Sequence, residues 1–146
     1  MIKIAEFWKP LDMAKSSTQR LQDAQQAMAS IQRYVAPEPR ERLNDDLSLS
    51  AVERQLSIVQ EALRVALLQE PALRQNWPDL DAVTRRCARL RDWENPVSME
   101  ELAGFVDAEL QNWQGRIASL LKQQQDEGAR LDQQIAENLR RLGYEF

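Results

Sequence analysis

The last third of the chain has the pattern of one helix that is longer than the globule a chain of this size forms. Ser98 and Glu101 have the spacing of a capping box at its start, and no residue forces an end before Gly143. A helix over residues 99–142 would be about 66 Å long. A compact chain of 146 residues has a diameter of roughly 38 Å. Such a helix must therefore project from the rest of the molecule or break.

Two apolar stretches of this helix, at residues 102–121 and 131–142, are separated by a polar stretch. Gly128 lies between them, but glycine costs a helix only about 1 kcal/mol relative to alanine. We therefore expect the helix to continue through Gly128. The apolar spacings of three and four are coiled-coil-like, although no full heptad with charged flanks is sustained.

The second apolar stretch predicts self-association. Its centre lies some 30 Å or more beyond the centre of the first if the helix stays straight. The chain has too few other helices to cover both stretches, and a twofold dimer is the commonest way to bury such a surface. We expect a homodimer whose interface contains Leu131, Ile135, Leu139 and Leu142.

The rest of the chain also has helical apolar spacing, without sustained strand alternation. We expect one all-α domain over residues 1–146, a helical bundle of three to four principal helices with a long, coiled-coil-like C-terminal helix. Ser50 and Glu53 form a second capping box, which predicts a helix start. The expected segments are an N-terminal docking segment at 1–9, helices at 10–35, 50–76, 78–94 and 99–142, and a connection at 36–49.

The composition argues against catalysis. The chain has no His, which excludes an imidazole base, a Ser-His or Cys-His pair and a His metal ligand. A single Cys excludes an intramolecular disulfide and a cysteine zinc cluster. Carboxylate pairs such as Glu100 and Glu101 lie in first helical turns, where acidic residues favour the helix dipole. We expect no enzyme activity, no cofactor and no metal site.

The sequence also predicts where the protein works. No apolar run approaches the roughly 20 residues that span a bilayer, and the first residues lack a signal-type apolar stretch. An unpaired cysteine is typical of a reducing compartment. We expect a cytoplasmic protein without a membrane partner. Arg outnumbers Lys by 15 to 4, which we interpret as the mark of a GC-rich bacterial genome.

Several side chains are candidates for contact with a partner. Tryptophans near prolines plug bundle corners or anchor interfaces, and leucines in the polar connection fit either a partner groove or a bundle end. Arginines on the helix at 78–94 share a line with an aromatic ring, but nearby acidic residues also fit a solvated, ion-paired face. The candidates are Trp8, Leu43, Leu47, Arg85, Arg89 and Trp93.

Cys87 has two interpretations. Its arginine neighbours would favour a reactive thiolate. However, Cys87 lies on the apolar line of Leu80, Val83 and Leu90, where a lone cysteine is usually a small core residue. We expect an inert thiol.

Together these features predict a non-catalytic protein–protein interaction module: an adaptor, chaperone-like or accessory subunit of a larger assembly, including inhibitor or immunity-type masking of a partner. The alternative is a nucleic-acid-associated accessory factor that uses the Arg85–Arg91 face, because arginine beside an aromatic ring can grip phosphate and stack a base. A net charge of −4 opposes this alternative. We expect a protein partner rather than nucleic acid.

Overall fold

Helices make up nearly all of the part of the chain that the structure describes, residues 15–143 of a computed structural model. In chain order they are α2 (Ser17–Val35), α3 (Pro39–Leu43), α4 (Asp46–Gln69), α5 (Leu73–Asn76), α6 (Leu80–Leu90), α7 (Met99–Gly104), the π-helix η1 (Phe105–Glu109) and α8 (Leu110–Arg141). No strand occurs among these residues, which confirms the predicted all-α class. The expected docking segment at 1–9, and residues 10–14, lie outside the described part.

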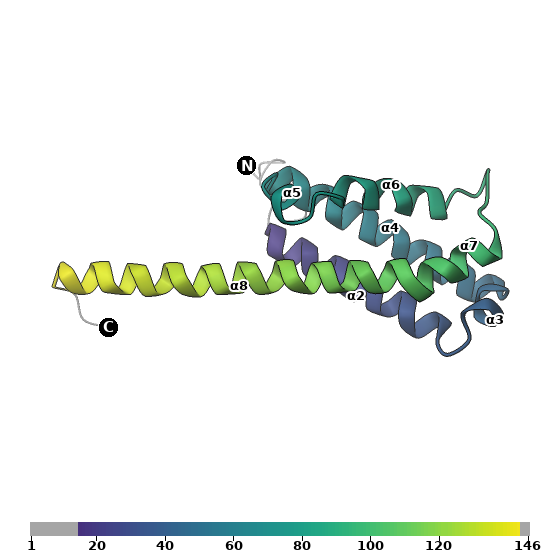
Figure 1. Cartoon of the computed structure of the whole chain (residues 1–146), viewed down its shortest axis with the longest axis horizontal. Helices are drawn as coiled ribbons and strands as arrows, with labels where there is room; N and C mark the ends of the chain where they lie inside the picture. The colour runs from purple at the N-terminus through teal and green to yellow at the C-terminus, as the bar shows by residue number, and fades with distance from the viewer. Residues whose placement is uncertain (1–14, 144–146) are drawn as a thin grey trace, which may run out of the picture.

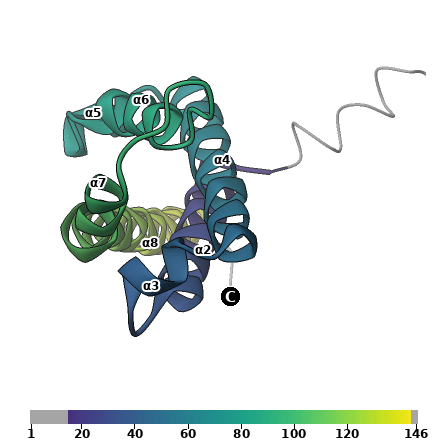
Figure 2. The ribbon, with the colours of Figure 1, turned by 90° about the vertical axis from the view of Figure 1, so that its right-hand side faces the viewer.

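The long helices run in alternating directions and surround a common core (Figures 1 and 2). α2 packs on α4, α4 packs on α6, and α8 packs on α2. α2 and α8 are antiparallel neighbours, and the first turn of α2 lies where α8 leaves the bundle (Figure 1).

The core follows the apolar spacing of each helix. Each long helix supplies side chains that are completely or almost completely buried, such as Ile31, Leu63, Leu80 and Ile117. Two aromatic rings of the C-terminal helix also meet inside: Phe105 and Trp113 pack edge to face, with ring centroids 4.9 Å apart.

Several element boundaries differ from the expected ones. The helix that ends at Val35 begins at Ser17 rather than at residue 10, and the expected connection at 36–49 contains the short helix α3. The helix expected over 50–76 ends at Gln69, before Pro71, and α5 follows it as a separate turn.

Two further differences have local causes in the side chains. α4 begins at Asp46, before the expected start at Ser50, because the side chain of Asp45 accepts a hydrogen bond from the backbone N–H of Ser48. α6 ends at Leu90, before the expected end at 94. Asp92 there accepts two backbone N–H groups that follow it, which turns the chain away.

The C-terminal helix is continuous over 43 residues, from α7 through η1 to the end of α8. Ser98 caps it by accepting a bond from the N–H of Glu101, as the capping spacing predicts. In η1 the N–H of Leu110 bonds the carbonyl of Phe105, five residues back. The helix passes through Gly128 without interruption, and its far half projects beyond the bundle (Figure 1).

Candidate interaction surfaces

A short chain of hydrogen bonds marks the point where α8 leaves the bundle. Thr18 donates its hydroxyl to the Gln124 amide oxygen at 2.6 Å. Gln124 in turn donates its amide nitrogen to Glu70 at 3.0 Å, and Ser17 donates to the same carboxylate at 3.3 Å. These bonds join α8 to the first turn of α2 and to the end of α4.

The last part of the C-terminal helix, residues 122–142, is called the arm; it starts at this hydrogen-bonded contact and ends at the cap residue Leu142. The ion pair on the arm is local, between Glu127 and Arg130 of the same helix. The apolar residues of the arm, here called the distal seam, are Leu131, Ile135, Leu139 and Leu142. Leu131 is 44%, Ile135 55% and Leu142 73% exposed, and Leu139 is half-buried. The distal seam is therefore open to a partner.

A shallow hollow of about 730 Å³ lies at the base of the arm. The start of α2, the end of α4, α5 and α8 line it, and its lining includes Leu73, Leu120, Gly128 and Leu131. The hollow and the distal seam thus form one continuous surface.

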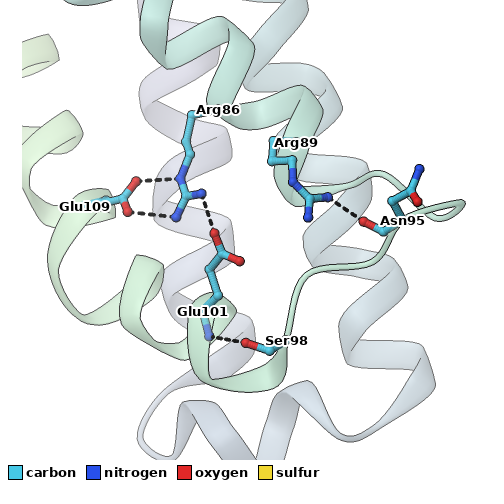
Figure 3. Close-up of polar contacts among 6 residues, drawn as sticks. All are labelled: Arg86, Arg89, Asn95, Ser98, Glu101 and Glu109. Carbon is cyan, nitrogen blue, oxygen red and sulfur yellow. Dashed lines mark hydrogen bonds and ion pairs between the residues drawn. The ribbon is translucent and has the colours of Figure 1, made fainter.

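Arg86 anchors the other end of the C-terminal helix to α6 (Figure 3). Its guanidinium donates two bonds of 2.9 Å to Glu109 and one of 2.7 Å to Glu101. The bonds to Glu109, and then those to Glu101, raise the pKa of Arg86 above its ordinary value, against the opposing effect of desolvation. Arg86 is therefore a structural tie between helices.

The other arginines of the Arg85–Arg91 face are also largely engaged within the chain. Arg89 donates to the backbone carbonyl of Asn95 (Figure 3), and Arg91 donates to Gln60 at 3.0 Å. Arg85 is exposed and helps to lower the pKa of Asp81, after the larger effect of Arg74. Arg85 and Arg89 lie on the surface, and Arg86, Arg89 and Arg91 all donate hydrogen bonds to groups within the chain.

The remaining candidates lie apart from the arm. Trp8 lies outside the described residues. Leu43 is buried in α3 and packs in the core, whereas Leu47 at the start of α4 is 81% exposed. Trp93 is 80% exposed in the connection between α6 and α7. This connection and the start of α4 lie at the end of the bundle opposite the arm (Figure 1).

Cys87 lies completely inside the core, on the inner face of α6. Burial raises the pKa of its thiol to about 12, although nearby Arg91 has a smaller opposing effect. The thiol is therefore protonated at neutral pH and out of reach of solvent.

The polar contacts that hold the C-terminal helix are functional features that the sequence did not predict. Glu70 and Gln124 are far apart in the sequence, and so are Arg86 and Glu109. Their side-chain types are common on any helix surface, so no local pattern marks them. A knowledge of which helices are neighbours would have been needed.

No group of side chains that could hold a metal ion is found among residues 15–143. Within the same range, every helix falls short of the length or the apolar character needed to cross a bilayer. Comparisons with protein-family models, with curated proteins and with solved structures find no match to this chain. Its function must be inferred from its surfaces.

Proposed function

We propose that this chain is a non-catalytic protein–protein interaction module, an adaptor or accessory subunit whose bundle carries an arm that binds another protein chain. The carrying observation is that α8 continues past its contact with the bundle at Gln124 as far as Arg141, with Leu131, Ile135 and Leu142 of the distal seam exposed. Helices owe most of their stability to burial of an apolar face. An apolar line on a projecting helix therefore favours a partner that covers it.

The charge distribution supports a protein partner over the nucleic-acid alternative. Arg86, Arg89 and Arg91 each donate hydrogen bonds to groups within the chain. This face therefore has fewer unengaged cations that could neutralise phosphates. The net charge of −4 adds a repulsive background. Masking of a partner, as by an inhibitor, stays within the proposed class.

The proposal includes two further points: the protein has no catalytic activity, and it works in the cytoplasm. The chain has no histidine, and burial keeps the thiol of Cys87 from acting as a nucleophile. Glu101 and Glu109, the two carboxylates drawn in Figure 3, both bind Arg86. We place the protein in the cytoplasm because its single cysteine is an unpaired thiol.

Site-specific photo-cross-linking in the source cell tests this function. A photoreactive residue replaces Ile135 on the distal seam or, as the matched control, exposed Gln133, which points away from the seam on the same helix. We expect protein adducts at position 135 and few at 133, and mass spectrometry identifies the captured chain. Equal or absent adducts at the two positions would contradict the proposal.

A further inference from the structure

We propose that the distal seam binds the arm of a second copy of this chain, in the antiparallel direction and centred near Ile135. This inference rests on the proposed function, because it names the partner of the same surface. Three observations support it. The first turn of α2 lies where the arm begins, acidic and basic residues lie at opposite ends of the arm, and Gly128 leaves open space on the seam.

α2 packs on the part of the α8 seam that lies inside the bundle. Its first turn reaches only as far as Gln124, where the arm begins. Thr18, in the first turn of α2, bonds Gln124 of α8. The same face of α8 continues past Gln124 to Leu131 and Ile135 at spacings of seven and four residues, with no described element over it. The arm of a second copy, laid antiparallel on this face, would extend the line that α2 follows.

A parallel pair of arms does not fit a bundle in which α2 packs on the seam side of α8. Paired helices lie about 8–10 Å apart. Because α2 packs on the seam side of α8, two parallel α8 helices at that distance would drive both copies of α2 into the same space. In the antiparallel pairing centred near Ile135, Leu142 of the second copy reaches the level of Gly128. Each arm then ends about 10 Å before the buried part of the other bundle begins.

Two pairs of like charges, one acidic and one basic, lie at opposite ends of the distal seam. Asp126 and Glu127 lie near its start, and Arg140 and Arg141 lie at its end. Glu127 and Arg141 are on the same flank of the seam, fourteen residues or about four turns apart. Equal flanks face each other in an antiparallel pair. Glu127, which also pairs with Arg130 of its own helix, therefore lies near Arg141 of the second copy, and the twofold symmetry repeats this contact.

Opposite flanks face each other in a parallel pair. That arrangement would set Glu127 against Asp132 of the second copy, five residues further along, and two like charges would meet. The charges that flank the seam and the position of α2 therefore both favour the antiparallel direction of the two arms.

Gly128 lies on the line of the distal seam and lines the hollow. Nothing lies within 4 Å of the place where a Cβ would stand. Glycine is less favourable than alanine inside a helix. No side chain of the described part of the same chain fills the space that the missing Cβ leaves at Gly128. In the antiparallel pairing, Leu142 of the second copy lies over Gly128 and fills that space.

Light scattering of the purified full chain at about 100 µM tests the choice of a second copy. We expect a dimer for the parent, and a soluble, helical monomer for the double variant Leu131→Glu with Ile135→Glu. The matched control, Ser119→Glu with Gln133→Glu, adds the same charge at exposed positions away from the seam and should stay dimeric.

A monomeric parent would overturn this inference and leave the arm to a different protein, or to the residues before Lys15. The proposed function would still stand if cross-linking at position 135 captured another protein. A double variant that remains dimeric would also overturn the inference, because the dimer would then use another surface.

Charge reversal tests the direction of pairing. Glu127→Arg places two arginines together in the antiparallel pair and should weaken dimerisation by roughly tenfold. Adding Arg141→Glu should restore the parent affinity. In a parallel pair, Glu127→Arg would instead face Asp132 and strengthen the dimer, and that result would overturn the proposal.

Oxidative cross-linking gives a second measure of direction. Ile135→Cys should form a disulfide between copies, because position 135 faces itself near the centre. Leu142→Cys should not, because its two copies lie about 21 Å apart along the antiparallel pair. A disulfide through position 142 would contradict the antiparallel direction.

Discussion

Arg86 connects α6 to the first turns of the C-terminal helix, and its loss should weaken the bundle. Replacement by methionine keeps much of the apolar stem but leaves Glu101 and Glu109 without their common donor. We expect Arg86→Met to lower the free energy of unfolding by about 1–2 kcal/mol, measured by urea denaturation. Arg64→Met breaks an exposed pair with Glu61 and should leave the midpoint unchanged. Equal effects of the two variants would contradict this role.

Cys87 should be unreactive in the folded protein. Its thiol is fully buried and its pKa is raised to about 12, against an ordinary value of 9.0. At pH 8 an aromatic disulfide reagent should therefore modify Cys87 only as fast as the protein unfolds, and urea should release the full reaction. Rapid modification of the folded chain, at the rate of a free thiol, would show that Cys87 is accessible.

The helix α4 starts at a different residue from the one that the sequence pattern predicts. Asp45 caps this helix, whereas Ser50, which the capping-box pattern favours, lies inside it and is exposed. We expect Asp45→Ala to cost about 1 kcal/mol of stability and Ser50→Ala to cost none, since alanine has the higher helix propensity. Thermal unfolding of the two variants measures the difference. A larger loss at Ser50 would place the helix start where the sequence pattern suggested.

The length and continuity of the C-terminal helix were predictable because their signals are local. Ser98 provides the cap, the apolar spacing persists, and Gly128 is too weak a breaker to end a helix. The π-turn of η1 has no comparable signal. The partners of Arg86 and Gln124 could not be predicted either, because they depend on which helices become neighbours. Leu43 shows the same limit, since only the packing of α3 decides that it is buried.

At the scale of the whole molecule, the arm makes the protein much longer than a compact chain of its size. In the antiparallel pair, the two bundles lie at opposite ends and the assembly is about 110 Å long. Small-angle scattering should give this maximum dimension for the parent and about 70 Å for the Leu131→Glu, Ile135→Glu monomer. A maximum near 40–50 Å, close to that of a compact globule, would mean that the arm folds back on the bundle.

In the proposed pair the arm stays straight and joins a second copy in the antiparallel direction. A nitroxide attached at Ser119→Cys measures this arrangement, because position 119 is exposed and Cys87 should not react. Pulsed electron spin resonance should give a distance of about 50 Å between the two labels, from 32 residues of helical rise across the centre. A distance below about 30 Å, as in a parallel pair, or no dipolar coupling between copies would contradict this arrangement.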